Sequence, residues 1–227
     1  MPTAAELDIV LLSLKVALCA LLVSLPVAVA VAFVLARKDF PGKTLFDAAV
    51  HLPLVLPPVV VGYALLLLFG ARGPIGRMLE PLGVVLMFRW TGAALAAAIM
   101  GFPLLVRAVR LAIEAVDPRL EIAARTLGAR RWRVFFTVTL PLAMPGVITG
   151  SLLSFARALG EFGATITFVS NIPGETRTLP LAIYTFTQSP GGDEAALRLA
   201  VLSVLLSLAA LAVSERLVRR SMQARHA

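Results

Sequence analysis

The sequence is poor in the residues that build metal centres, disulfides and catalytic sites. Its 227 residues include one cysteine, Cys19, and two histidines, His51 and His226. One cysteine allows no internal disulfide, and the histidines are far apart in sequence, so a Cys/His metal cluster is unsupported. There is also no Ser-His-Asp spacing typical of a hydrolase. The sequence therefore predicts no metal, no cofactor and no catalytic residue, and we expect a non-catalytic protein.

Charged residues are also scarce. They make up 15% of the chain, and hydrophobic residues make up 59%. Soluble domains average about 25% charged and roughly 45–50% apolar residues. The net charge of +8 could suggest a nucleic-acid partner, but the basic residues flank apolar runs rather than forming a polar face. That placement follows the positive-inside rule of membrane proteins, so we expect a membrane protein that contacts lipid and binds no nucleic acid.

A nucleotide-binding loop is missing. Gly42, Lys43 and Thr44 look like the end of a phosphate loop, but that motif requires a glycine five residues earlier, where Arg37 stands. Any ATP-driven work must therefore be supplied by a separate subunit.

Long apolar runs predict the fold. About twenty apolar residues span the hydrocarbon core of a bilayer. We expect a single all-α transmembrane domain, residues 1–227, with five spans at about 14–36, 52–70, 91–110, 142–169 and 195–215. Prolines should bend the second span, and Gly160 and Gly163 should kink or unwind the fourth. Turn residues in the segment 170–194 predict a loop.

The distribution of basic residues predicts the orientation. With the N-terminus outside and the C-terminus inside, fourteen lysines and arginines lie on the cytoplasmic side and five on the other. Since basic residues favour the cytoplasmic side, this is the predicted topology.

The segment 117–141 is a basic, helix-forming stretch that this topology places in the cytoplasm. Asp117 is a good N-cap and Pro118 suits the first helical position, so a short helix should begin there. It should run to about Leu127 and end at Gly128 in the left-handed conformation. A second helix over 130–139 should lead into the fourth span. One interpretation is a segment that anchors at anionic headgroups, as basic helices do.

The same segment resembles the "EAA" coupling loop of ABC-importer permeases. Ala123, Ala124 and Gly128 match in spacing, as do Val138 and Leu140-Pro141. The resemblance implies contact with an ATPase subunit through residues of the first helix and the turn after it: Glu121, Ala123, Ala124, Leu127, Gly128 and Arg130. The family's usual glutamate position is Ile122, whereas Glu121 lies one residue earlier, about 100° around a helix. Either Glu121 or its neighbours form the main contact.

Three further stretches resemble narrower families. Residues 158–165 (ALGEFGAT) are similar to the signature of permeases for the tetrahedral oxyanions molybdate, tungstate and sulfate. Residues 51–63, and 171–178 with 187–192, look like the permease of molybdate ABC importers. The resemblance implies a type I ABC-importer permease of the bacterial inner membrane. It would act by alternating access as a homodimer with two ATPase subunits and a periplasmic molybdate-binding protein. Tungstate or sulfate is the alternative substrate, and a passive channel or membrane enzyme is the alternative class.

Two charges near the middle of the fourth span are candidates for the translocation pathway. Arg157 and Glu161 are four residues apart, on one face of a helix. Charges inside a membrane indicate function by default. Either Arg157 contacts the anion, or it neutralises Glu161 and braces the helix. We favour the brace, because a strong anion site would trap its passenger. The hydroxyl groups of Ser154, Thr165 and Thr167 would then line the path.

Overall fold

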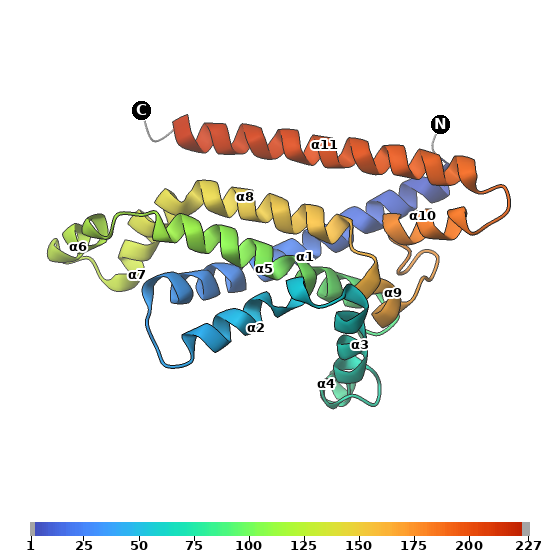
Figure 1. Ribbon diagram of the computed structural model, residues 1–227, viewed down its shortest axis with the longest axis horizontal. Helices are drawn as coiled ribbons and strands as arrows, with labels where there is room; N and C mark the ends of the chain where they lie inside the picture. The colour runs from blue at the N-terminus through green and yellow to red at the C-terminus, as the bar shows by residue number, and fades with distance from the viewer. Residues whose placement is uncertain (1–2, 224–227) are drawn as a thin grey trace.

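The computed structural model describes residues 3–223, and every regular element within them is helical. Figure 1 shows a bundle of long helices with shorter ones at its edges and ends. The elements in chain order are α1 (Ala4–Arg37), α2 (Lys43–Val55), α3 (Pro58–Phe69), α4 (Pro74–Leu79), the 3-10 turn η1 (Glu80–Leu82), α5 (Trp90–Glu114), α6 (Pro118–Thr126), α7 (Arg131–Val134), the π-helical turn η2 (Phe135–Thr139), α8 (Leu140–Leu159), α9 (Gly163–Val169), α10 (Leu179–Thr187) and α11 (Asp193–Gln223).

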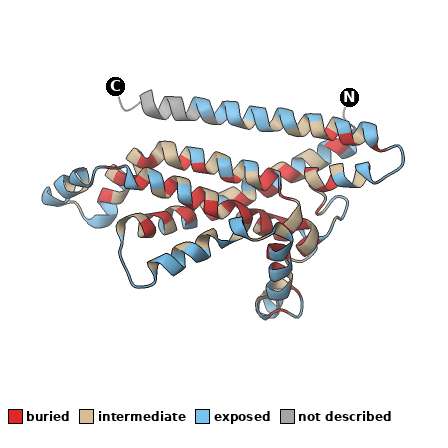
Figure 2. Cartoon of the chain, viewed as in Figure 1, coloured by how far each residue is buried: buried red, intermediate tan, exposed pale blue. Residues whose placement is uncertain are grey.

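The core lies where α1, α5 and α8 pack together. Small side chains fill one half of it, including Ala17, Ala93 and Ala97, which are almost fully buried. Larger ones such as Leu35 and Val109 fill the other half. Small residues let helix backbones approach closely, which is how helices associate where lipid removes the hydrophobic drive. Figure 2 accordingly shows buried residues along these three helices and exposed ones over α2 and the described part of α11.

Four single helices are long and apolar enough to cross a membrane: Ala4–Arg37, Trp90–Glu114, Arg131–Leu159 and Asp193–Val213. The pair α2 and α3 also passes as one unit, but it bends by 112°. By length and composition, the described chain therefore has four candidate spans, or five if the bent pair is one span. Prolines were expected to bend the second span over 52–70, and the chain bends there between α2 and α3. Pro57 and Pro58 each lack an amide donor and restrict the residue before them, so α2 ends at Val55 and α3 starts afresh.

The other boundaries follow local chemistry. The first helix begins at Ala4 rather than near residue 14, because Thr3 and Glu6 form a capping box. The predicted interruption of the fourth span is confirmed: α8 ends at Leu159 and α9 begins at Gly163. The second helix predicted over 130–139 is helical from Arg131 to Thr139, as α7 and η2, and it leads into α8 as expected. The wider π turn ends just before Pro141, which has no amide hydrogen to donate.

The predicted loop 170–194 contains a helix, α10. Pro180 is among the turn residues that predicted this loop, but it stands in the first turn of α10, where proline is favoured. The amide of Leu179 donates to the hydroxyl of Ser13 at 2.7 Å, which ties α10 to α1.

The contact between α3 and α9 generates a prediction about stability. A Cβ atom at Gly62 would lie 2.5 Å from the carbonyl oxygen of Ala164, so Gly62→Ala must push the two helices apart. Overpacking of this kind costs about 1–3 kcal/mol, which should lower the melting temperature by about 2–10 °C. Gly160→Ala is the matched control, because the nearest atom to its Cβ lies at 3.7 Å. Equal melting temperatures for the two variants would contradict the packing account.

Candidate functional site

The short helix α6 projects from one end of the bundle beside α7 (Figure 1). Its predicted start is confirmed: the carboxylate of Asp117 accepts a hydrogen bond from the amide of Arg119 at 2.9 Å, and Pro118 occupies the first turn. Its predicted end is confirmed too, because Gly128 has a φ of +86°. Glycine reaches this left-handed conformation without a steric penalty, so the chain reverses there toward α7.

Glu121 fixes α6 to two other elements through one oxygen. Its Oε1 accepts hydrogen bonds from Arg37 at the end of α1, at 2.9 and 3.2 Å, and from the hydroxyl of Thr139 in η2, at 2.9 Å. Arg37 also donates to the carbonyl of Val116 at 2.9 Å. The side chains of Arg37 and Glu121 are only 16% and 20% exposed. The carboxylate therefore faces the protein itself, and α1, α6 and η2 are held together at this point.

The outer face of α6, which we define as Leu120, Ile122, Ala123 and Leu127, points away from the bundle. Leu127 is 88% exposed, Ile122 57% and Leu120 48%. Ala123 is exposed as well, while Ala124 is partly buried. The sequence left open whether Glu121 or its neighbours would meet a partner, and that contact stays a prediction; the structure turns Glu121 inward and exposes its neighbours. The outer face of α6 is therefore apolar, and no other part of the described chain covers it.

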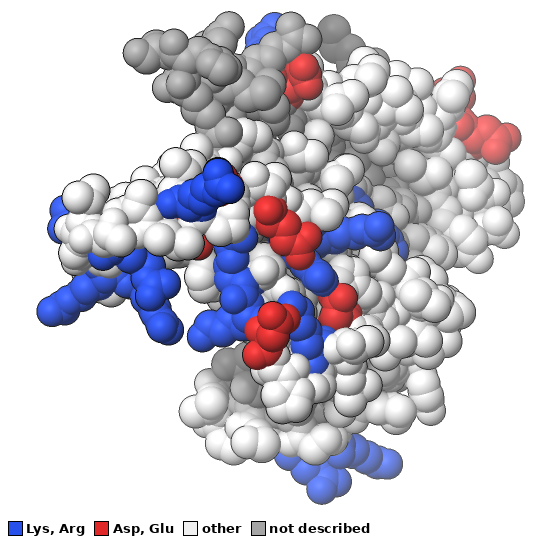
Figure 3. Space-filling view, turned by 60° about the vertical axis from the view of Figure 1, so that its left-hand side comes forward, with Lys and Arg blue, Asp and Glu red and all other residues white. Residues whose placement is uncertain are grey.

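Basic residues surround that face. Arg125, Arg130, Arg131 and Arg133 are all exposed. Figure 3 brings this end of the molecule forward and shows lysine and arginine side chains gathered there, with fewer acidic ones between them. The end of the molecule that carries α6 is thus apolar at its tip and positive around it.

The candidate pathway residues Arg157 and Glu161 form an ion pair at 2.5 Å. The Glu161 side chain is 1% exposed, and its Oε1 accepts a hydrogen bond from the amide of Ala164 at 2.7 Å. Glu161 therefore caps the first turn of α9 while Arg157 neutralises it. These are the contacts that the bracing interpretation requires at the break between α8 and α9.

The three candidate hydroxyls do not lie together on one surface. Ser154 and Thr165 are buried inside the chain, Ser154 next to Gly101 of α5. Thr167 is partly exposed, and its hydroxyl donates to the carbonyl of Gly163 at 2.8 Å. In this conformation only Arg157 and Thr167 of the five pathway candidates keep partly exposed side chains, and the lining role of Ser154 and Thr165 stays a prediction.

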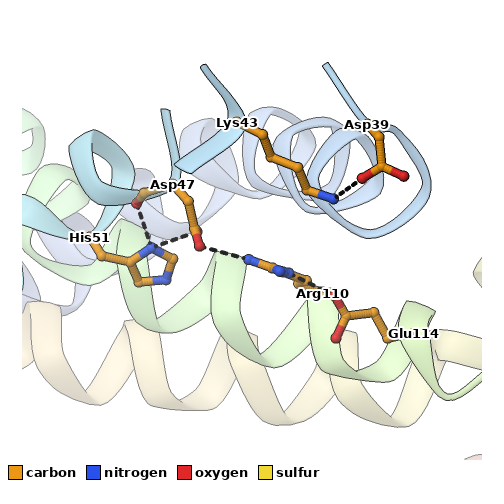
Figure 4. Close-up of polar contacts among 6 residues, drawn as sticks. All are labelled: Asp39, Lys43, Asp47, His51, Arg110 and Glu114. Atoms are coloured by element: carbon orange, nitrogen blue, oxygen red, sulfur yellow. Dashed lines mark hydrogen bonds and ion pairs between the residues drawn. The ribbon is translucent and has the colours of Figure 1, made fainter. Parts of the chain in front are cut away.

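Sequence reasoning missed a polar cluster that joins α2 to α5 (Figure 4). Arg110 bonds Asp47 at 2.9 Å and Glu114 at 2.8 Å, while His51 lies 3.2 Å from the same aspartate. The spacing of four residues in Asp47/His51 and Arg110/Glu114 was a local signal, but no local signal joins the two pairs. Within residues 3–223 no group of three His, Cys, Asp or Glu side chains could hold a metal ion.

The hydrogen bonds that Glu121 accepts from Arg37 and Thr139, which we name the anchor at Glu121, predict a local effect on α6. In Glu121→Ala, Arg37 and Thr139 lose their shared acceptor, which costs about 1–3 kcal/mol and should speed amide hydrogen exchange in α6 about 5- to 100-fold. The double variant Arg37→Ala/Glu121→Ala should lose less stability than the sum of the two single variants, because both remove the Arg37–Glu121 contact. Each removes only one further bond, from Arg37 to Val116 or from Thr139 to Glu121. Arg119→Gln, an exposed change on the same helix, is the control. Additive effects in the double variant would show that the two residues act independently.

Comparison with solved structures identifies the fold. The chain is similar to a bacterial ABC transporter that imports the polysaccharide alginate, with a TM-score of 0.77 and 16% identity over 96% of this chain and 80% of that one. It is also similar to the inward-facing MetNI methionine ABC transporter, with a TM-score of 0.67 and 16% identity over 96% and 94%. At such low identity these likenesses show the fold alone, which is that of ABC-transporter membrane subunits.

Comparison of sequences identifies the family. The chain is 60% identical, over 96% of both chains, to the molybdenum transport system permease protein ModB of Escherichia coli. It is 56% identical to the protein of the same name in Haemophilus influenzae, over 95% of this chain and 94% of that one. The family described as "Binding-protein-dependent transport system inner membrane component" matches residues 24–223. The chain therefore belongs to the family of binding-protein-dependent transport system inner membrane components.

Proposed function

We propose that this chain is the permease subunit of an ATP-driven importer that carries molybdate across a bacterial inner membrane. The observation that carries the proposal is the 60% identity with the molybdenum permease of E. coli, which runs over 96% of both chains. A shorter or more distant match would support transport in general, whereas this one covers nearly the whole of both chains.

The proposed assembly contains two copies of this chain, two ATPase subunits on the cytoplasmic side and a binding protein on the outer side. The outer face of α6 supports the ATPase contact, because Leu120, Ile122 and Leu127 are exposed there and a docked subunit would cover them. A separate ATPase subunit is also supported by the missing phosphate-loop glycine, because Arg37 stands at its position and the chain cannot bind ATP through that motif.

The anchor at Glu121 suggests how ATPase movement reaches the membrane. Glu121 bonds both Arg37 of α1 and Thr139 of η2, and η2 leads directly into α8. A displacement of α6 would therefore move the ends of α1 and α8 with it. Packed helices move as rigid bodies between discrete arrangements. ATP binding and release would thereby switch the homodimer between outward-open and inward-open states.

The proposed pathway runs past the two helix breaks. Gly163 of α9 abuts Pro58 of α3, so the break between α2 and α3 meets the break between α8 and α9. The Arg157–Glu161 pair at this place is neutral overall. A neutral lining binds a dianion more weakly than a free positive charge would, and conduction requires binding weak enough for release.

A second substrate has specific support. The chain is 42% identical, over 68% of its length and 54% of the relative's, to the sulfate permease CysW of Synechococcus elongatus. Tungstate and sulfate share the tetrahedral geometry and charge of molybdate. A passive channel or a membrane enzyme is disfavoured, because a channel has no use for the exposed outer face of α6.

Transport in proteoliposomes tests the proposal. We expect molybdate uptake only when the permease, its ATPase, the binding protein and ATP are all present, with tungstate competing well and sulfate poorly. Uptake without ATP would indicate a channel, and preferential competition by sulfate would indicate a sulfate permease.

Arg157→Gln separates the two interpretations of the intramembrane pair. Removing one partner leaves Glu161 buried and unpaired, which costs about 3–5 kcal/mol, so we expect a less stable complex with lower yield. In Arg157→Gln/Glu161→Gln the amide oxygen can still accept from Ala164, and stability and uptake per complex should recover. The measurements are melting temperature, ATPase activity and molybdate uptake. If the double variant is stable and hydrolyses ATP but carries no molybdate, Arg157 contacts the anion instead.

A further inference from the structure

A cavity of about 790 Å³ opens between the end of α1, α6 and the stretch α7–η2. Its wall is largely apolar and is built around three phenylalanines in edge-to-face contact. The ring centroids of Phe33 and Phe135 lie 4.9 Å apart, and those of Phe135 and Phe136 lie 5.0 Å apart. The function proposed above assigns no role to this cavity.

The cavity also has a positive rim. Arg37, Lys38, Arg125 and Arg131 line it, together with the two carboxylates Asp39 and Glu121. Both carboxylates are already paired, Asp39 with Lys43 and Glu121 with Arg37, each at 2.9 Å.

Three cations therefore remain to attract an anion. Within residues 3–223 no carboxylate pairs with Lys38, Arg125 or Arg131. The rim thus carries a positive charge that the described chain does not neutralise.

The apolar and basic groups that line the cavity lie in the order expected at the cytoplasmic edge of the membrane in the predicted topology. Phe33 and Val34 lie in the last turns of the apolar helix α1, and Arg37 and Lys38 follow at its end. Trp132, which is 64% exposed, also lines the cavity, and tryptophan favours the headgroup level of a bilayer. A phospholipid has the same order, from apolar chains to a phosphodiester. An inorganic oxyanion would use only the rim and leave the aromatic wall unfilled.

We propose that this cavity binds an anionic phospholipid of the inner leaflet. Lys38, Arg125 and Arg131 hold the phosphodiester, and the aromatic wall holds the first part of the acyl chains. Basic clusters beside a membrane helix bind anionic lipids by this electrostatic attraction. Since the Arg37–Glu121 contact forms part of the wall, a bound lipid packs against the anchor of α6.

Quenching of Trp132 fluorescence by lipid with brominated chains tests the proposal in the purified full chain. The variant Trp90→Phe leaves Trp132 as the chain's sole tryptophan. Brominated phosphatidylglycerol should quench at about a tenfold lower mole fraction than brominated phosphatidylcholine. The added change Arg125→Gln/Arg131→Gln should abolish that preference. The matched control is Arg130→Gln/Arg133→Gln, which removes equal charge from the same segment but from residues that do not line the cavity.

Several outcomes would overturn the proposal. Equal quenching by the two lipids would show that the cavity does not select an anion. Equal loss of preference in the control variant would show attraction by general surface charge. Displacement of brominated phosphatidylglycerol by inorganic phosphate or molybdate would assign the rim to a free oxyanion, and loss of quenching when the ATPase binds would assign the cavity to that subunit. The melting temperature of each variant shows that it is folded, and the readout needs no transport, so it is independent of the substrate.

Discussion

The carboxylate of Glu121 joins the helix that leaves the bundle to two helices that stay in it. One oxygen accepts from Arg37 and from Thr139, in a site where both charged side chains are mostly buried. A mostly buried charge is stable only when it is paired, so Glu121 must keep facing Arg37 and Thr139. This requirement fixes the rotation of α6 about its own axis. The exposure of Ile122 and Leu127, the shape of the cavity beneath α6 and the proposed transmission of movement to α1 and α8 all depend on that rotation.

A second constraint acts inside the membrane part of the fold, where water cannot satisfy a broken backbone. The chain breaks twice, at Pro57 and between α8 and α9, and it brings the two breaks together. Close packing at Gly62 brings α3 against α9, and Glu161 bonds the first turn of α9. The same features that interrupt the helices therefore support each other, and they place a neutralised ion pair, not a free charge, beside the proposed path.

Local chemistry made part of this structure predictable. Asp117, Pro118 and Gly128 predicted the bounds of α6 because caps and left-handed turns depend on residues next to one another. The inward direction of Glu121 was not predictable, since its partner Arg37 lies 84 residues away in sequence. The prolines predicted a bend between α2 and α3, but the angle of 112° was not predictable, since α3 packs against α9, about a hundred residues later in the chain.

Site-specific cross-linking between the permease and its ATPase tests the central claim most directly. A cysteine at Leu127, on the outer face of α6, should cross-link to the ATPase subunit in a chain whose native Cys19 is replaced by serine. A cysteine at Leu153, which is exposed on α8 within the predicted fourth span, should not. The account predicts an ATPase adduct from residue 127 alone. An adduct from residue 153, or none from residue 127 in an assembled and active complex, would contradict it.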